Sequence, residues 1–282
     1  MVLINDIVKD YGDFHLNVSL ELPDGRVSGL VGKNGSGKST TIKLILGLVK
    51  PDAGSIEVFG KTSGQLSAQD KQNIGVALSN SGFNSNLNVK DVICILRKMY
   101  SEFDEDYFRQ GCSRMRVPLD KQIKSFSTGM KAKLRVLVAI SHKAKLLIMD
   151  EPTAGLDVEA RTNILDMLRD YLSEDEERSV IITSHISTDL EGICDDIYLI
   201  HDGTIILHED TDRILDNYAV LKVDEKMYNK LDKSHILSEK KEKFGYICFT
   251  DERQYYSENY PGIVIENGSI DDLIIMMTGG RE

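Results

Sequence analysis

The 282-residue chain lacks the features that would hold it in a membrane or stabilise it outside the cell. No apolar run approaches the roughly 20 residues of a membrane-spanning helix, since the run Leu134 to Ile140 is short and contains Arg135. The N-terminus has no charged-then-apolar signal pattern. We therefore expect a cytoplasmic protein that reaches the inner face of the cell membrane only through a partner.

Cysteine and positive charge are also scarce. The four cysteines lie far apart without CxxC spacing, which argues against a disulfide framework or a cysteine metal site. Lys and Arg number 34 against 45 Asp and Glu, a net charge of −11. Because an acidic protein has no general attraction for nucleic acid or anionic lipid, we expect no nucleic-acid partner. The length allows one large domain with a small one, or two medium ones.

One glycine-rich stretch is prominent, Gly32 to Thr40. It fits the phosphate-loop template, in which four residues separate two glycines and Lys and Ser follow. A strand is predicted before it and a helix after it, over Thr41 to Leu46. Successive backbone N–H groups and the helix N-terminus can converge on a triphosphate. Lys38 would reach the β- and γ-phosphates, and the Ser39 hydroxyl would bind Mg²⁺. The candidate phosphate-binding residues are Asn34, Gly35, Ser36, Gly37, Lys38, Ser39 and Thr40.

Two carboxylates end a second apolar strand, Leu146 to Glu151. Such a strand tip beside a phosphate loop is where a magnesium ligand is needed, and Asp150 fits that role. Glu151 fits the role of polarising the attacking water. His185 ends a later strand on the same edge, where open α/β sheets bind ligands, and we expect it to contact the γ-phosphate. Without the phosphate loop, a solvated acidic pair and a structural histidine would be the ordinary interpretations.

The rest of the chain divides by pattern. Strands predicted in the first 60 residues, including the alternating stretch Leu16 to Leu22, are followed by a polar loop at Thr62 to Lys71. Residues 85–142 are predicted to be helical, with helix starts at Asn88 and Ser127. Strands alternating with helices return afterwards and indicate a largely parallel sheet covered on both faces. A small mixed tail follows His208.

In this order the motifs resemble the nucleotide-binding subunits of ABC transporters, over residues 1 to about 210. Phe126-Ser127-Thr128-Gly129-Met130 is similar to the family signature, and Ala154-Gly155-Leu156-Asp157 to its D-loop. Ser184-His185 resembles its switch histidine, and Tyr11 the aromatic residue that stacks on adenine. The resemblance implies ATP and Mg²⁺ as cofactors and adds Tyr11, Ser127, Gly129 and Asp157 to the ATP site.

The resemblance also implies a fold and an assembly. The fold is α/β, a P-loop NTPase (RecA-like) core with an N-terminal antiparallel β subdomain, a helical insertion and a small α+β C-terminal domain. The expected domains are residues 1–209 and 210–282. Two copies, identical or different, would pack head to tail with each ATP between one phosphate loop and the other copy's signature. This motion would drive separate transmembrane subunits that dock near the helical insertion.

One departure concerns the family's Gln, which should fall near Ser79; the chain has no Gln there, and Ser79 or Asn80 is the candidate substitute. The signature and tail are similar to Gram-positive exporter subunits of the bacitracin and antimicrobial-peptide type. We therefore predict the ATP-hydrolysing subunit of an ABC exporter. The alternatives are a soluble non-transport ABC ATPase, a nucleotide-gated binding module with low turnover, and an importer ATPase.

Overall fold

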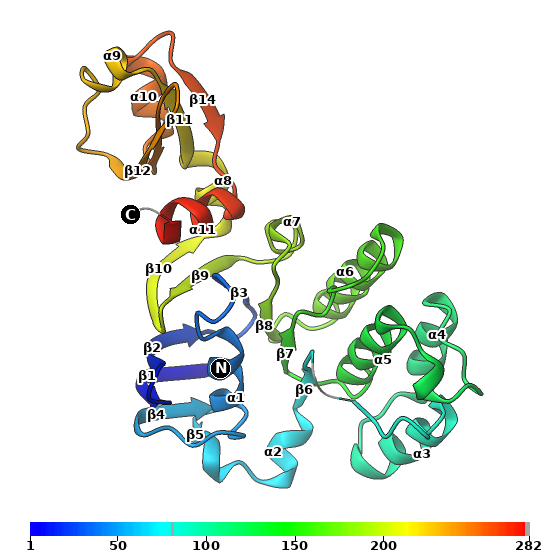
Figure 1. The fold of residues 1–282 in the computed structure, drawn as a ribbon. Helices are drawn as coiled ribbons and strands as arrows, with labels where there is room; N and C mark the ends of the chain where they lie inside the picture. The colour runs from blue at the N-terminus through cyan, green and yellow to red at the C-terminus, as the bar shows by residue number, and fades with distance from the viewer. Residues whose placement is uncertain (80–81, 280–282) are drawn as a thin grey trace.

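The computed structural model describes residues 1–79 and 82–279, and within them ten strands form one large sheet in the order β5-β4-β1-β2-β10-β9-β3-β8-β7-β6 (Figure 1). No helix in this described part is long and apolar enough to cross a membrane. The strands of this sheet are β1 Val2–Asp10, β2 His15–Leu22, β3 Val27–Val31, β4 Ala53–Val58, β5 Lys61–Thr62, β6 Ile74–Ala77, β7 Leu146–Asp150, β8 Ser179–Thr183, β9 Asp196–His201 and β10 Thr204–Asp210.

The centre of the large sheet is parallel. Strands β9, β3, β8, β7 and β6 pair in parallel register, for example Asp150 of β7 with Thr183 of β8. Every residue of β3, β7 and β8 is buried, because helices cover both faces of this part of the sheet. The parallel centre confirms the α/β prediction, and it brings the ends of β3 and β7 to one edge.

The other half of the sheet is antiparallel except for the short parallel contact between β2 and β10. Strand β2 pairs with β1, and its residues alternate strictly between exposed and buried, as the sequence pattern predicted. The Asp202-Gly203 dipeptide predicts a hairpin from the sequence alone, and strands β9 and β10 form it, with Asp202 at φ 44° and Gly203 at φ 77°. Two consecutive positive φ angles are what a two-residue type I′ turn requires. Strands β1, β2 and β4 of this half share a hydrophobic core with Ile42, Leu44 and Ile45 of the helix that follows β3.

The helical region contains α3 Val89–Met99, α4 Glu105–Arg114 and α5 Thr128–Ile140. Its predicted starts are confirmed: Asn88 forms a reciprocal capping box with Asp91, and the Ser127 hydroxyl accepts a hydrogen bond from the N–H of Met130. Helix α6, Val158–Ser173, packs beside α5. The buried apolar residues of these helices and of the parallel strands belong to one hydrophobic core.

The prediction of a polar loop at Thr62 to Lys71 is wrong. The segment contains a 3₁₀ turn at Ser63–Gln65 and begins helix α2, Ala68–Gln72. Ser67 and Asp70 form a capping box that fixes the start of this helix. The sequence carried that signal, a Ser followed three residues later by an acid, but no apolar stripe followed it because α2 buries none of its residues.

Within the described part, a separate four-stranded sheet, β12-β13-β11-β14, lies in residues 219–269, which we call the C-terminal unit (Figure 1). Its strands are β11 Ala219–Val223, β12 Ile236–Glu242, β13 Gly245–Thr250 and β14 Val264–Asn267. The remaining helices are α1 Lys38–Ile45, α7 Ser187–Glu191, α8 Thr211–Asn217, α9 Glu225–Tyr228, α10 Arg253–Asn259 and α11 Ile270–Gly279. Helix α11 leaves the C-terminal unit and buries Ile270 and Leu273 in the core of the main body.

Candidate active site

A pocket of about 270 Å³ lies at the carboxyl edge of the parallel strands. Helix α1 begins at Lys38, three residues earlier than predicted, so the last residues of the glycine-rich loop form the first helical turn. The amides of a first turn have no partner inside the helix and are available to an anion. The pocket is lined by Phe14, Asn34, Gly35, Ser36, Gly37, Lys38, Ser39, Thr40, Ser79, Asp150 and Glu151.

The two inner glycines of the loop, Gly35 and Gly37, are required for different structural reasons. Gly37, at φ 119°, precedes α1, and a Cβ there would lie 2.6 Å from Leu16 Cδ1. Gly35, at φ 84°, has open space where its Cβ would be, so the turn alone requires it. Gly37 is therefore needed for packing against β2 as well as for its backbone conformation.

Lys38 lies in the pocket with its ammonium on backbone oxygens. Its Nζ donates hydrogen bonds to the carbonyls of Gly32 at 2.6 Å and Lys33 at 3.1 Å. Burial lowers the pKa of Lys38, and the nearby carboxylates of Glu151 and Asp150 oppose that shift. The ammonium is thus partly desolvated, which strengthens its attraction for a triphosphate.

Asp150 is nearly buried and is surrounded by hydroxyl groups. Thr183 Oγ1 donates to Oδ1 at 2.9 Å, and Ser79 Oγ donates to Oδ2 at 3.0 Å. Ser39 Oγ lies 3.4 Å from both carboxylate oxygens. The structure therefore brings the predicted Ser39 and Asp150 together and adds Ser79 beside them. Asn80, the other proposed substitute, lies outside the described residues.

Glu151 turns the chain out of β7 at φ 54° and faces His185. The backbone N–H of His185 donates to Glu151 Oε2 at 3.2 Å, and His185 Nδ1 also contacts this oxygen. The backbone N–H of Glu151 donates to Thr183 Oγ1 at 3.0 Å. His185 lies two residues beyond β8, not at the strand end as predicted. Thr183, which supports both acids, was not predicted; its only sequence signal was its place just before Ser184-His185.

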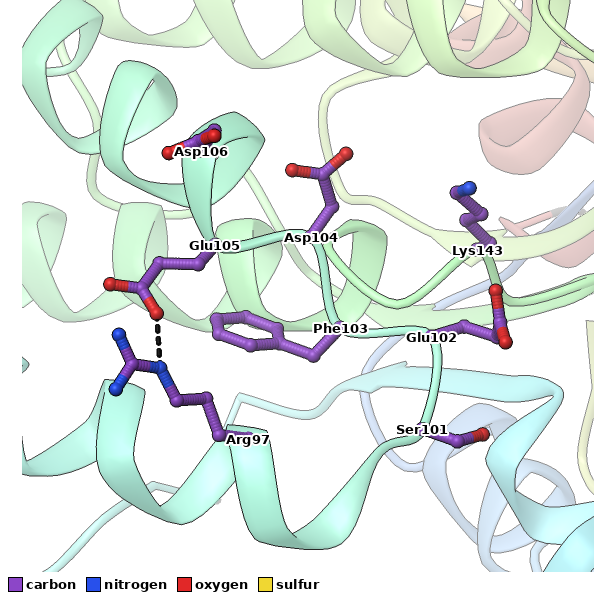
Figure 2. A pocket seen from close by; sticks show the side chains of 8 residues that line it. All are labelled: Arg97, Ser101, Glu102, Phe103, Asp104, Glu105, Asp106 and Lys143. Atoms are coloured by element: carbon purple, nitrogen blue, oxygen red, sulfur yellow. Dashed lines mark hydrogen bonds and ion pairs between the residues drawn. The ribbon is translucent and has the colours of Figure 1, made fainter.

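A larger hollow of about 540 Å³ lies between the end of α3 and the start of α4. Four of its lining residues are acidic: Glu102, Asp104, Glu105 and Asp106. Figure 2 shows that only Glu105 among them contacts Arg97 across the hollow. These acids outnumber Arg97 and Lys143 in the lining, and a triphosphate fits better at the glycine-rich loop, where Lys38 and the first amides of α1 lie.

Comparison with known proteins agrees with this geometry. Residues 16–154 match the family model described as "ABC transporter". The chain is 31% identical over 219 residues to the ABC transporter ATP-binding protein YtrB of Bacillus subtilis, covering 78% of this chain and 72% of that protein. It is 35% identical to the linearmycin resistance ATP-binding protein LnrL of the same species, with 73% and 68% covered. To the bacitracin transport ATP-binding protein BcrA of Bacillus licheniformis it is 32% identical, again with 73% and 68% covered.

The chain belongs to the ABC transporter family of ATP-binding proteins. It is an ATP-binding ABC ATPase, and the expectation of an exporter-type ATPase is confirmed at the level of the family. A solved ATP-binding subunit of an ABC transporter matches the fold with a TM-score of 0.67 at 24% identity, covering 76% of this chain and 91% of that one. A dimeric ATP-binding cassette with ADP and phosphate matches with a TM-score of 0.65 at 20% identity, covering 75% and 99%.

The four residues that only the resemblance to ABC proteins suggested do not line the pocket. Ser127 is exposed at the start of α5, and Asp157 is exposed where its carboxylate accepts a hydrogen bond from the N–H of Ala160. Gly129 packs against Leu156, to which a Cβ on this glycine would approach within 3.0 Å. The signature and D-loop segments of this ABC protein are therefore in contact with each other on its surface.

Tyr11, the fourth of these residues, is 53% exposed, and its ring lies 5.6 Å from Lys9 Nζ. The aromatic ring that does line the pocket of this ABC protein is Phe14, which the sequence analysis missed. The backbone N–H of Tyr11 donates to the carbonyl of Phe14 at 2.9 Å, so the two rings belong to one tight turn. Phe14 gave no sequence signal of its own because it stands in a turn between two strands.

The oxygens around Asp150 fit a magnesium ion. Mg²⁺ prefers oxygen ligands and is typically held by one or two carboxylates together with phosphate oxygens and water. Asp150, Ser39 and Ser79 supply one carboxylate and two hydroxyls at the pocket wall. The described residues contain no cluster of three or more His, Cys, Asp or Glu able to hold a metal by themselves, so a metal here would depend on the nucleotide for its remaining ligands.

Proposed function

We propose that this chain is the ATP-hydrolysing subunit of an exporter that removes antimicrobial compounds. The support for the chemistry is a single observation: the loop lysine, one carboxylate held by hydroxyls and a second carboxylate paired with a histidine meet at one pocket. The support for the substrate class is similarity to proteins named for linearmycin resistance and for bacitracin and lantibiotic transport.

In this proposal Lys38 and the loop amides hold the phosphates. The Lys38 ammonium exchanges the carbonyls of Gly32 and Lys33 for β- and γ-phosphate oxygens, which are better partners because they are charged. Ser39 and Asp150 hold Mg²⁺, with Ser79 beside Asp150 in place of the missing Gln. When bound, the metal neutralises charge that develops on the phosphates.

Glu151 acts on the attacking water, since its carboxylate faces the pocket and lies next to the phosphate loop. His185 fixes the orientation of that carboxylate through its backbone N–H and its ring. The side chain of His185 is 60% exposed, which leaves its other ring nitrogen free to approach the γ-phosphate of bound ATP.

The remaining site residues are proposed to act between two copies of the chain. Ser127 and Gly129 lie at an exposed helix start, where a hydroxyl, N–H groups and a positive helix end can meet the γ-phosphate on a second copy. Asp157 would face that same interface, and Tyr11 would stack on the adenine. ATP would thus join two subunits head to tail, and hydrolysis would release them.

Separate membrane subunits would use this motion and hold the complex at the cytoplasmic face of the membrane. We propose a nucleotide-binding domain of residues 1–209, a helical subdomain of about residues 85–142 that receives those subunits, and an accessory domain of residues 210–282. Support for the division is that strands β11 to β14 form a sheet of their own.

Mixing two inactive variants tests the function and the shared site together. Lys38→Met disables the loop. Ser127→Asp keeps a side chain able to cap α5 but places a negative charge before the opposite γ-phosphate. A mixed dimer then contains one site built only from intact halves. Random 1:1 pairing of homodimers should therefore recover about a quarter of normal phosphate release, because half the dimers are mixed and each has one of two sites.

The control for this experiment is Ser257→Asp, which adds the same charge at an exposed serine of α10 and should stay active alone. Mixing Lys38→Met with Lys38→Met should recover nothing. A mixture that releases no more phosphate than its two components separately would contradict the shared site. Failure of the wild-type chain, assembled with its membrane subunits, to release phosphate from ATP would contradict the proposed function.

A further inference from the structure

Helix α11 contacts, at its two ends, two segments next to the active site of this chain. At its start, the N–H of Ile270 donates to Glu191 Oε1 at 3.1 Å, and Glu191 belongs to α7, the helix that follows His185. At its end, the carbonyl of Thr278 accepts a hydrogen bond from Lys33 Nζ at 2.9 Å. Figure 1 shows α11 lying between the C-terminal unit and the large sheet. Helix α11 thus links α7, which follows His185, to Lys33 of the phosphate loop.

The position of α11 is fixed by packing. Ile270 and Leu273 are fully buried and Met276 is 7% exposed, all within the apolar core of the main body. Ser269 caps the helix by accepting a hydrogen bond from the N–H of Asp272 at 3.1 Å. Because these contacts hold the helix axis, its C-terminal carbonyls form a rigid acceptor for Lys33.

Lys33 is also connected to the catalytic lysine. Its own carbonyl accepts hydrogen bonds from Lys38 Nζ at 3.1 Å and from the N–H of Ser36 at 3.2 Å. Lys33 therefore bonds to α11 through its side chain and to Lys38 and Ser36 through its backbone carbonyl. The positive charge also neutralises the negative end of the α11 dipole, which would otherwise face a loop that must bind anions.

We propose that α11 braces the phosphate loop through Lys33, making Lys33 a positioning residue that strengthens ATP binding. A loop ordered before ATP arrives loses less conformational freedom on binding, so the complex is tighter. The inference rests on ATP binding at this loop, which it extends by giving the tail a role in the site. Coupling of this kind is reciprocal, so ATP must in turn stabilise the end of α11.

Replacing Lys33 measures the effect. Lys33→Met keeps the length of the side chain but removes the donor and the charge, and it should weaken binding of a fluorescent, non-hydrolysable ATP analogue about two- to fivefold, the range of a lysine at a helix C-terminus. KM for ATP should rise by the same factor while kcat stays constant. Lys33→Arg should restore binding. Lys50→Met, which removes the same charge from an exposed site outside the loop, should bind normally.

Hydrogen exchange on the unmodified chain provides an independent test that needs no hydrolysis. The analogue should slow exchange in the last turn of α11, residues 276–279, and this protection should shrink in Lys33→Met at saturating analogue. Protection of the loop alone, with α11 unchanged, would overturn the brace while leaving ATP binding and the proposed function intact. Normal affinity in a folded Lys33→Met, or equal weakening in Lys33→Arg, would also overturn it.

Discussion

Replacing Glu151 by Gln separates binding of ATP from its hydrolysis. The amide has the size of the carboxylate, and its oxygen can still accept the hydrogen bond from the N–H of His185, 3.2 Å away in the native chain. It cannot take up a proton from water. The loss of a general base costs about 10²–10⁴-fold in rate, which corresponds to about 2.7–5.4 kcal/mol in the barrier.

Binding should survive this change. The groups that hold phosphate, Lys38 and the loop amides, are untouched, and one negative charge beside the triphosphate is gone. The measurements are phosphate release at saturating ATP, the dissociation constant of a fluorescent ATP analogue, and light scattering to detect an ATP-bound dimer that no longer separates. Glu176→Gln serves as the matched control, because Glu176 is an exposed acid that does not line the pocket.

Two results would refute this reasoning about Glu151. Phosphate release at the normal rate would show that its carboxylate is not the base, whatever its position. Loss of analogue binding in a folded variant would show that the carboxylate supports the pocket and that the pairing with His185 is structural. A large loss of turnover with normal binding is the expected outcome.

Three further changes address the surroundings of the site. Ser79→Ala should weaken the binding of Mn²⁺, used in place of Mg²⁺ with nucleotide present, several-fold in titrations followed by electron paramagnetic resonance. The reason is that Asp150 loses a hydrogen-bond donor at 3.0 Å. Unchanged Mn²⁺ affinity would exclude Ser79 from the metal site. Thr183→Val should lower the free energy of unfolding by about 1–3 kcal/mol, since a buried hydroxyl that serves Asp150 and Glu151 is lost; denaturant titration measures it. Burial lowers the pKa of His142, so the folded chain keeps this ring neutral while the unfolded chain protonates it near its ordinary pKa of about 6.5. Stability should therefore fall as pH drops below that value towards the folded pKa, and His142→Gln should lose less over the same range.

Local sequence signals predicted much of the fold because they depend on neighbouring residues. The capped helix starts at Asn88 and Ser127 and the Asp202-Gly203 hairpin all need only a few adjacent positions. Helix α2 was missed because a short exposed helix has no apolar stripe to reveal it. Strand β12 was missed as well, since five of its seven residues are exposed and its pattern is that of a loop.

Contacts between distant segments could not be predicted from the sequence. Thr183 reaches two acids only because β8 lies beside β7, and Phe14 lines the pocket only because the turn before β2 folds over the loop. The contact between Lys33 and Thr278 joins residues 245 positions apart. No local pattern encodes such pairings, because they follow from strand order and from where α11 packs.

The exposure of the motifs argues for the shared site more strongly than the motifs themselves. The residues assigned to one copy, among them Lys38, Asp150 and Glu151, are connected to one another through the pocket and the end of β8. Those assigned to the opposite copy, Ser127 and Asp157, point to solvent although each begins a helix. The start of α5 is capped by the neutral Ser127 hydroxyl and is exposed, so it can receive an anion from another molecule. A second copy carrying ATP would supply that anion, and the charge introduced by Ser127→Asp is directed at this step.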